Sequence, residues 1–170
     1  LRNQLIGCSG VDDVAGGEID GARIGFALPR PAAVHRVVDA VIAERLRSDV
    51  ALVSQIGQYI VSAGGKRIRP RLVLLFANAL GYDGAEQFTL AATVEFIHTA
   101  TLLHDDVVDE SSLRRGRQTA NAVFGNAASV LVGDFLYSRA FQMMVSVNNM
   151  RVLDVLADAG LAPVTRYTST

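Results

Sequence analysis

The sequence has little of several residue types, and each shortage excludes a class of protein. The 170 residues contain no tryptophan, one cysteine and only 6% aromatic residues. The single cysteine, Cys8, cannot form an internal disulfide, which excludes a disulfide-stapled secreted domain and favours the cytoplasm. The formal net charge is only -1 at pH 7. We therefore expect no nucleic-acid partner, and any polyanion has to be bound by a local cluster of cations.

Long apolar runs are also missing. The longest, such as residues 72–80, fall far short of the roughly 20 residues that span a bilayer, and Asp134 interrupts the apolar stretch at residues 130–141. We therefore expect no transmembrane segment. No alternating pattern predicts a strand of useful length. The abundant class is apolar residues, which make up 50% of the chain and indicate a globular protein of about one domain.

These apolar residues recur with the 3.6-residue period of amphipathic helices from Pro31 onward. Residues 1–30 show no such period and are interpreted as a loosely ordered leader. Helices are predicted from Pro31 to about residue 42 and from about residue 50 to the turn at Gly64-Gly65. The next is predicted over residues 71–80, with Pro70 in its first turn and Gly81 as its C-terminal cap.

Three further helices are expected along the rest of the chain. The spacing of Asp83 and Glu86 approximates a capping box, and the helix that starts there runs beyond Asp105. Thr119 and Asn126 are expected to cap two more helices, the second over about residues 127–147. Because the connections are short, neighbouring helices are expected to be antiparallel. The predicted fold class is therefore all-α, an antiparallel helical bundle.

The most informative stretch is His104-Asp105-Asp106-Val107-Val108-Asp109, the acidic motif. Asp105 and Asp109 lie four residues apart and project from one helical face, about 6 Å from each other. Their charges repel unless a cation lies between them. Mg²⁺ is the hard cation that uses one or two carboxylates and leaves its other positions to water and phosphates. On spacing alone, a solvated acidic face is an equally good interpretation.

Two cationic segments flank this motif. The basic turn, residues 64–71, places four cations on a glycine turn that leads into a helix N-terminus, where backbone N–H groups also favour anions. The basic loop, residues 114–117, contains three arginines, which can hold phosphate oxygens bidentately. Each segment alone reads as a solvated loop or an RNA-contact patch. Together with the acidic motif they indicate a site for two phosphorylated substrates.

Three motifs carry a resemblance to a known family. Gly64-Gly65-Lys66-x-x-Arg69-Pro70, Glu95-x-Ile97-His98-x-x-x-Leu102-x-His104-Asp105-Asp106-x-x-Asp109 and Arg114-Arg115-Gly116 resemble, in the same order, motifs of the trans-prenyl diphosphate synthases. Gly133-Asp134-Phe135-Leu136 is similar to the helix that follows in the family. The run from Ile42 to about Ala159 looks most like the octaprenyl diphosphate synthases of quinone biosynthesis. The resemblance implies an incomplete isoprenoid-synthase bundle over residues 31–159, and residues 160–170 form a tail without the likeness.

The resemblance also implies an activity and a role for each site residue. The enzyme would be an Mg²⁺-dependent prenyltransferase that condenses an allylic diphosphate with isopentenyl diphosphate, giving a long-chain polyprenyl diphosphate, and it would be a homodimer. The residues at the allylic diphosphate would be Asp105 and Asp109, which bind Mg²⁺, with Asp106 in support and Arg114 in contact with the diphosphate. The residues at isopentenyl diphosphate would be Lys66, Arg69, His98 and Arg115.

The chain departs from the family in one respect, which leaves two alternatives. Family members are about twice as long and carry a second aspartate-rich motif, which this chain lacks, because Asp154 and Asp158 read as an ordinary exposed helix face. We therefore expect the 170-residue chain alone to be inactive. It could instead be a non-catalytic subunit that pairs with a complete chain. A metal-dependent phosphohydrolase using His104 and Asp105 is the other alternative, and it would need further ligands.

Product length is predicted to depend on Ala100 and Thr101, one to one and a half turns before Asp105. The resemblance implies that small residues here let the hydrocarbon tail grow down the helix, toward Phe141, Met143 and Met144 as candidates for the tunnel floor. In a chain completed to the family's length, Ala100→Tyr should fill this passage and shift products to about three or four isoprene units, because exclusion is steric. Chromatography of dephosphorylated products measures this, and an unchanged long-chain distribution would contradict the tunnel assignment.

Overall fold

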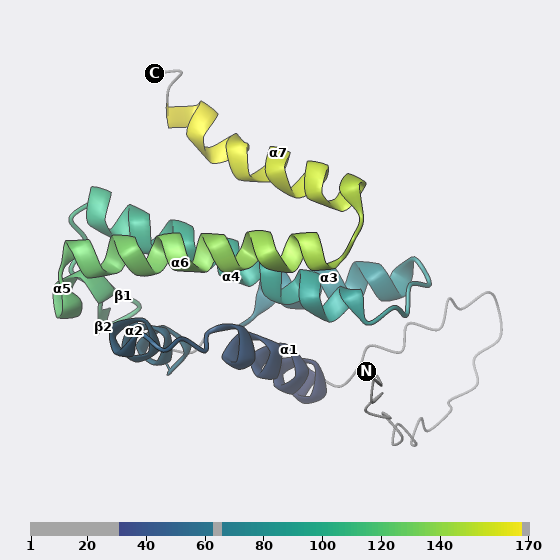
Figure 1. Cartoon of the computed structure of the whole chain (residues 1–170), viewed down its shortest axis with the longest axis horizontal. Coiled ribbons are helices and arrows are strands. Elements are labelled where there is room, and N and C mark those ends of the chain that lie inside the picture. Colours follow the sequence, from purple (N-terminus) through teal and green to yellow (C-terminus); the bar gives the residue numbers. More distant parts are fainter. Residues whose placement is uncertain (1–30, 63–65, 168–170) are drawn as a thin grey trace.

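The computed structural model describes the backbone of residues 31–62 and 66–167, and the side chains of residues 36–62 and 66–159. The described chain is built almost wholly from helices, as Figure 1 shows, which confirms the all-α fold class. The helices are α1 (Pro31–Arg45), α2 (Ala51–Ser62), α3 (Ile68–Ala79), α4 (Glu86–Val108), α5 (Ala120–Phe124), α6 (Asn126–Ser146) and α7 (Met150–Tyr167). The leader of residues 1–30 and the Gly64-Gly65 pair lie outside the described residues.

A short antiparallel hairpin, which the sequence did not predict, connects α4 to α5. Its strands are β1 (Leu113–Arg114) and β2 (Arg117–Gln118), with Leu113 opposite Gln118 and Arg114 opposite Arg117. Arg115 and Gly116 form the turn, with φ values of 52° and 77°. Two-residue strands are too short to produce an alternating pattern, so the basic loop gave no signal of its hairpin geometry.

The end of α3 follows the sequence prediction closely. Gly81 has φ 71°, a left-handed conformation that glycine adopts without steric cost. Its N–H donates to the carbonyl of Asn78 at 2.9 Å, and the N–H of Tyr82 donates to that of Ala77 at 2.8 Å. These two bonds form a Schellman motif, so Gly81 is confirmed as the residue that ends the helix. The helix starts at Ile68, three residues before the predicted Arg71, and Pro70 lies in its first turn.

The predictions of helix N-caps were less accurate. The capping box at Asp83 and Glu86 is wrong, because Ala85 is the N-cap of α4 and no side chain bonds to the helix end there. Glu86 instead accepts a hydrogen bond from the Tyr82 hydroxyl at 2.8 Å. Asn126 is the first residue of α6, whose N-cap is Gly125. Thr119 does occupy the N-cap of α5 but makes no capping hydrogen bond.

The core lies along the contact between α4 and α6, which run side by side through the molecule (Figure 1). Small residues allow the two backbones to approach closely; Ala92 and Ala100 on α4 and Ala140 on α6 are fully buried. The hydroxyl of Ser129, on α6, donates across the contact to the carbonyl of Leu103 at 3.2 Å. Dense packing of this kind holds α4 rigidly, and α4 carries the acidic motif.

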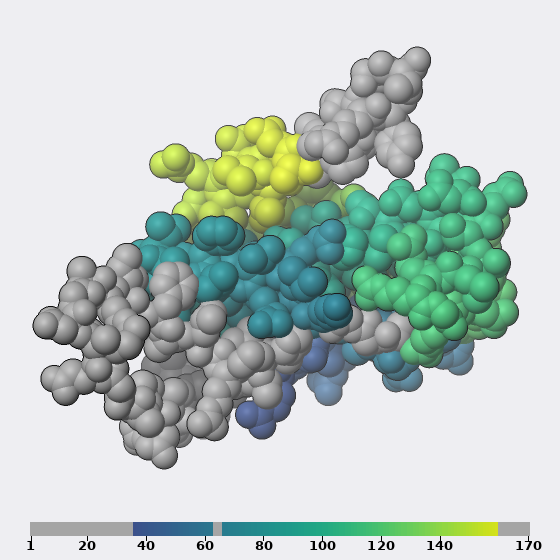
Figure 2. All heavy atoms as spheres, turned by 180° about the vertical axis from the view of Figure 1, so that it is seen from behind, coloured from purple at the N-terminus to yellow at the C-terminus, as the bar shows by residue number. Residues whose placement is uncertain are grey.

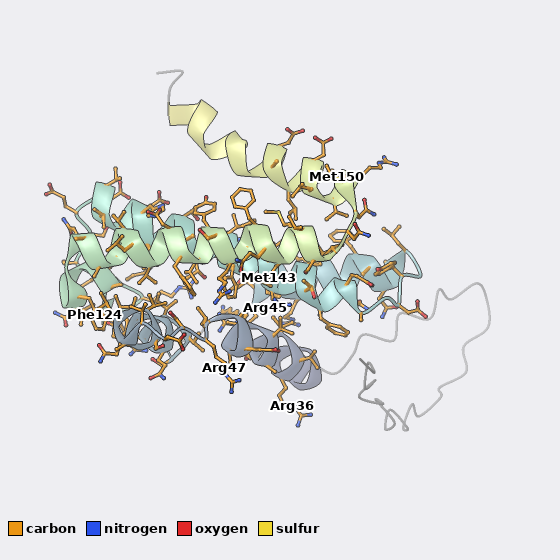
Figure 3. All side chains as sticks on the ribbon, viewed as in Figure 1. Arg36, Arg45, Arg47, Phe124, Met143 and Met150 are labelled. Atoms are coloured by element: carbon orange, nitrogen blue, oxygen red, sulfur yellow. The ribbon has the colours of Figure 1, made fainter. Side chains whose placement is uncertain are left out.

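Among the described residues, the other helices each contact α4 or α6. Side chains of α1 and α2 fill the space beneath α4 and α6, with Met143 among the buried residues between the layers (Figure 3). Figure 2 shows the opposite side, where teal residues of α3 and α4 form the centre of the surface. In Figure 1, α7 turns back along α6 and then diverges from it, and its Asp154 and Asp158 are exposed. No helix in the described residues is long and apolar enough to cross a membrane.

Gly133 of α6 provides the space for the His104 ring of α4. A Cβ at Gly133 would lie 2.3 Å from His104 Nε2, whereas a Cβ at Gly57 in α2 would lie 3.5 Å from the nearest Leu46 atom. Both glycines are helical, so alanine gains about 0.5–1 kcal/mol of propensity at either position.

We predict that Gly57→Ala is neutral or stabilising, whereas Gly133→Ala lowers the free energy of unfolding by about 1–2 kcal/mol because the His104 ring is displaced. In a His104→Ala background the clash is gone, and Gly133→Ala should become stabilising. Urea unfolding of Gly57→Ala, Gly133→Ala, His104→Ala and the double variant His104→Ala/Gly133→Ala measures whether each glycine substitution raises or lowers the free energy of unfolding. A Gly133→Ala effect that is independent of residue 104 would contradict this packing.

Candidate functional site

One cavity of about 680 Å³ lies at the meeting point of the two basic segments and α4. Its lining includes all four residues that the sequence assigned to one diphosphate: Lys66, Arg69, His98 and Arg115. Arg114 and Asp106 line it as well. Residues from three segments far apart in the sequence therefore converge on one space, and most of their charges are positive. Such a cavity is suited to an anion with several charges.

The basic turn is anchored by Arg67, which the sequence analysis did not single out from the other cations. Arg67 has φ 45°, a left-handed conformation that costs a non-glycine residue free energy. Its guanidinium donates to Asp39 Oδ1 at 3.0 Å, on α1, and to Glu95 Oε1 at 2.9 Å, on α4. The Arg67 guanidinium thus holds the turn against α1 and α4. Lys66 and Arg69 flank Arg67 and Ile68 in the sequence. Both are exposed and can contact a ligand.

Asp106 and Arg114 form the main ion pair of the site. The Arg114 guanidinium donates through Nε at 3.0 Å and through its terminal nitrogen at 2.6 Å to Asp106 Oδ1. The Asp106 side chain is only 6% exposed, so this carboxylate needs its partner to compensate for the loss of water. The hydrogen bond to Asp106 raises the pKa of Arg114, and the charges of Asp106, Asp105 and Asp109 act in the same direction. Arg114 therefore lies close to all three aspartates.

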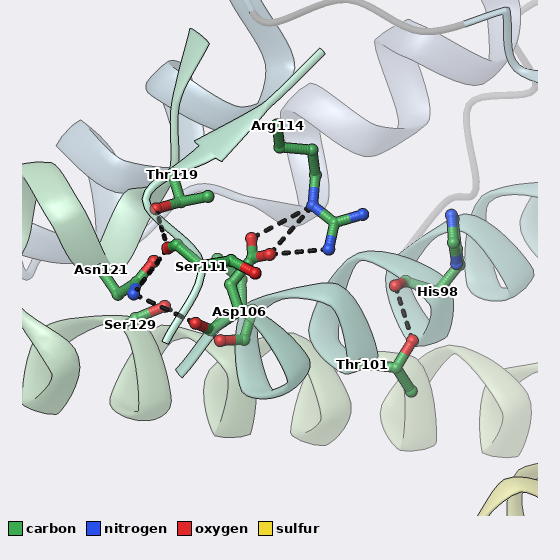
Figure 4. A network of polar contacts seen from close by, with 9 residues as sticks. His98, Thr101, Asp106, Ser111, Arg114, Thr119, Asn121 and Ser129 are labelled. Carbon is green, nitrogen blue, oxygen red and sulfur yellow. Dashed lines mark hydrogen bonds and ion pairs between the residues drawn. The ribbon is translucent and has the colours of Figure 1, made fainter. Parts of the chain in front are cut away.

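Hydrogen bonds from side chains to backbone carbonyls fix the segment between the Asp106–Arg114 ion pair and α5 (Figure 4). The Asn121 amide donates to the carbonyls of Asp106 and Ser111, each at 3.1 Å. The Thr119 hydroxyl donates to the Ser111 carbonyl at 2.7 Å, which explains why it does not cap α5. Asn121, after the hairpin, is thereby bonded to the last turn of α4, and both Thr119 and Asn121 are bonded to Ser111, before the hairpin.

The two other aspartates of the motif differ from Asp106 in exposure. Asp105 and Asp109 are both exposed, and Asp109 is the C-cap residue of α4. The described residues contain no group of three His, Cys, Asp or Glu side chains arranged for a metal ion. Two free carboxylates beside a cationic cavity fit Mg²⁺ rather than zinc, because Mg²⁺ takes only one or two protein carboxylates and fills its remaining positions with phosphate oxygens and water.

His98 projects from α4 toward the same side as Arg114 (Figure 4). Burial lowers the pKa of His98 below its ordinary value of 6.5, and the positive charges of Arg69, Arg115 and Arg114 lower it further, against a smaller opposing effect of Glu95. His98 is therefore neutral near pH 7 and presents a hydrogen-bonding ring among cations. An anion placed between them would favour its protonated form.

The two residues assigned to product length do not line the cavity. Ala100 is fully buried at 0% exposure, and the Thr101 hydroxyl donates to the His98 carbonyl at 2.8 Å. Of the proposed tunnel floor, Met143 and Met144 are buried, whereas Phe141 is 53% exposed. A tyrosine at position 100 would therefore have to displace packed neighbours in the described chain, so the Ala100→Tyr experiment needs a check of folding. The role of Ala100 and Thr101 stays a prediction.

His104 faces away from the cavity, toward α6. Its ring stacks on Tyr137 with 6.0 Å between ring centroids, and its Nε2 lies 3.3 Å from Asp134 Oδ1. Nε2 also lies 3.4 Å from the carbonyl of Val130. Because the described residues bring no third metal ligand to this pair, the phosphohydrolase alternative gains no support from the geometry.

Comparison with known proteins gives consistent matches. The sequence model of the family described as polyprenyl synthetase matches residues 50–164. The octaprenyl diphosphate synthase of Escherichia coli (strain K12) is 65% identical over 122 residues, which cover 72% of this chain and 38% of that protein. The octaprenyl diphosphate synthase of Haemophilus influenzae is 60% identical over 118 residues, covering 69% of this chain and 36% of that protein.

Solved structures match in the same way. A decaprenyl diphosphate synthase from Rhodobacter capsulatus has 53% sequence identity and a TM-score of 0.72, over 76% of this chain and 40% of that chain. A polyprenyl synthase from Caulobacter crescentus CB15, complexed with calcium and isoprenyl diphosphate, has 46% identity and a TM-score of 0.73, over 82% of this chain and 44% of that chain. The chain thus spans well under half the length of each of these four relatives.

The environment of His98 leads to a prediction about pH. Its folded-state pKa is lowered, so the unfolded chain binds this proton more readily and the free energy of unfolding should fall as pH drops through the ordinary histidine range. NMR titration should place the His98 midpoint below 6.5, and Arg69→Met should raise it. Arg139→Met, a cation lost outside the cavity, is the control. A midpoint insensitive to Arg69 would contradict the arrangement.

Proposed function

Because the chain belongs to the polyprenyl synthetase family, we propose that it carries the diphosphate-binding part of an Mg²⁺-dependent prenyltransferase. The reaction joins an allylic diphosphate to isopentenyl diphosphate and lengthens the chain by one isoprene unit. The observation that carries the proposal is that Lys66, Arg69, His98 and Arg115 all line one cavity, which lies beside the acidic motif. The matched relatives are themselves polyprenyl diphosphate synthases by name.

The cavity cations would bind the diphosphate of isopentenyl diphosphate. Lys66, Arg69 and Arg115 are exposed at the cavity, so they can approach phosphate oxygens without breaking an internal ion pair. His98 lies among them; its pKa is lowered first by burial and then by the charge of Arg69, and a bound anion would offset that charge and favour the protonated ring. Leu102, Leu103 and Ile60 line the same cavity and offer an apolar surface to the isoprene carbons.

The acidic motif would bind the allylic diphosphate. Asp105 and Asp109 are the carboxylates that would hold Mg²⁺, and a bound Mg²⁺ would supply positive charge to neutralise the leaving diphosphate. Asp106, in contrast, acts by holding Arg114 in place through their ion pair, and Arg114 stabilises the negative charge that develops as the allylic C–O bond breaks. The double bond of isopentenyl diphosphate then attacks the allylic carbon, and loss of a proton restores an allylic diphosphate.

Three finer points of the proposal rest on relatives or on the resemblance. The Caulobacter crescentus relative is complexed with a divalent cation, calcium, and isoprenyl diphosphate, which supports the same ligand chemistry here. The octaprenyl diphosphate synthases among the relatives support a long-chain product. A homodimer is proposed from the resemblance, and the cytoplasm is proposed from the single cysteine.

Steady-state kinetics of a chain completed to the family's length test the proposal, because one variant should chiefly change kcat and another should chiefly change KM. Asp105→Ala should lower kcat by about 100-fold or more, because stabilisation of the leaving group is lost. Lys66→Ala should chiefly raise the KM for isopentenyl diphosphate, by about 10-fold, because one charge-assisted hydrogen bond is lost.

Asp158→Ala, an exposed helical aspartate on α7, and Arg151→Ala, an exposed cation on the same helix, are the matched controls and should leave both constants unchanged. An unaltered KM in Lys66→Ala would show that the basic turn is only a surface loop. Normal turnover in Asp105→Ala would overturn the role of the acidic motif.

A further inference from the structure

Tyr59 and Arg117 link the two cationic segments directly, although neither belongs to the motifs that carry the family resemblance. Tyr59 lies in the last turn of α2, and its hydroxyl donates to the carbonyl of Gln118, on β2, at 2.6 Å. The Arg117 guanidinium lies 5.3 Å from the centroid of the Tyr59 ring, within the range of a cation–π contact. The Tyr59 ring also meets Phe124 of α5 edge to face, with 5.5 Å between centroids.

Arg117 closes the end of α2 as well. It donates to the carbonyl of Ser62, the last residue of that helix, at 3.1 Å. The last turn of α2 contains no basic residue of its own, so a cation from the hairpin serves a helix end where cations are favourable. Ser62 precedes Lys66 by only four positions in the chain. Lys66 therefore lies within about 14 Å of the end of α2, because each residue spans at most about 3.6 Å.

The described residues that flank the Gly64-Gly65 pair, Ser62 and Arg67, are thus each held by contacts of an arginine. Arg67 binds α1 and α4 through Asp39 and Glu95, while Arg117 holds the α2 end at Ser62. The hairpin that supplies Arg117 also carries Arg115 into the cavity. A displacement of the hairpin would therefore move Arg115 and the approach to Lys66 together.

We propose that Tyr59 and Arg117 are positioning residues, a clamp that sets the separation of Lys66 and Arg115 across the cavity to match one diphosphate group. The inference deepens the proposed function and rests on it. Both residues line the cavity, but their contacts join the two cationic segments: the tyrosine hydroxyl donates to Gln118, and the Arg117 guanidinium donates to Ser62 and lies against the Tyr59 ring. Pre-set spacing raises affinity because the ligand does not have to order the two loops.

Calorimetric titration of the 170-residue chain with inorganic diphosphate tests the clamp. Tyr59→Phe is the decisive variant, because it removes one hydroxyl, keeps the ring and changes no charge; we expect a 3- to 10-fold weaker Kd, in line with the loss of one hydrogen bond. Arg117→Met should weaken binding by at least as much, because it also removes a cation from the cavity lining, and Tyr59→Phe alone isolates the positioning effect. In the double variant, the fold-increase in Kd should be smaller than the product of the two single fold-increases, since both substitutions break the same clamp.

Two matched controls separate positioning from general stability. Tyr82→Phe also removes a bonded hydroxyl, the partner of Glu86. Arg139→Met removes a guanidinium that lies 5.1 Å from the Phe135 ring centroid and donates to the carbonyl of Arg47, just beyond the end of α1. The contacts of Arg139 are of the same kind as those of Arg117 but lie outside the cavity, so both control variants should keep the wild-type Kd.

Hydrogen exchange gives a readout that does not depend on the ligand. Amides of Lys66 to Arg69 should exchange faster in Tyr59→Phe and Arg117→Met than in the wild type, and at the wild-type rate in the two controls. Unchanged exchange in both clamp variants would overturn the inference.

The Kd values of the wild type, Lys66→Ala and Tyr59→Phe distinguish a failure of the clamp from a failure of the proposed function. Weaker binding by Lys66→Ala with a wild-type Kd for Tyr59→Phe would overturn the clamp and leave the proposed function standing. Failure of the wild-type chain to bind inorganic diphosphate would overturn the proposed function, and the inference with it.

Discussion

The ion pair between Asp106 and Arg114 is the interaction on which the site depends. A carboxylate that is only 6% exposed has to be neutralised, and the guanidinium that does so comes from the hairpin after α4. The pair therefore holds the hairpin against the last turn of α4 and assigns different tasks to neighbouring aspartates. Asp106 is used internally, whereas Asp105 and Asp109 remain exposed and able to accept a cation. Breaking the pair would leave a buried charge without a partner, which costs several kcal/mol.

The same division between structural and available charges recurs in the basic segments. Arg67 is bound by Asp39 and Glu95, and Arg117 by Ser62 and Tyr59, whereas Lys66, Arg69 and Arg115 have no such contact within the described residues, although all five cations line the cavity. Each cationic segment thus combines arginines that hold the backbone with cations that are left for an anion. Such preorganisation is the condition under which electrostatic stabilisation of a leaving group is most effective, because no reorganisation is needed during the reaction.

The sequence predicted the helical fold well, because apolar residues at 3.6-residue spacing and the glycine at position 81 are local signals. It also identified Lys66, Arg69, His98 and Arg115, which the cavity brings together. It missed the hairpin and the roles of Tyr59, Arg67 and Asn121, since these depend on contacts between residues distant in the chain. Tyr59 and Gln118, for example, are 59 positions apart. The capping prediction at Glu86 failed because its side chain bonds to Tyr82 instead, and the one at Asn126 failed because Gly125 is the N-cap and Asn126 already lies inside α6.

The central claim is that the basic turn, His98 and the basic loop form one diphosphate site. Addition of inorganic diphosphate to isotope-labelled chain, followed by NMR, tests it most directly. The account predicts that amide and side-chain signals of Lys66, Arg69, His98 and Arg115 shift together along one saturation curve, and that those of Arg151 and Asp158 on α7 do not move. Shifts confined to one cationic segment, or segments that saturate at different concentrations, would contradict it.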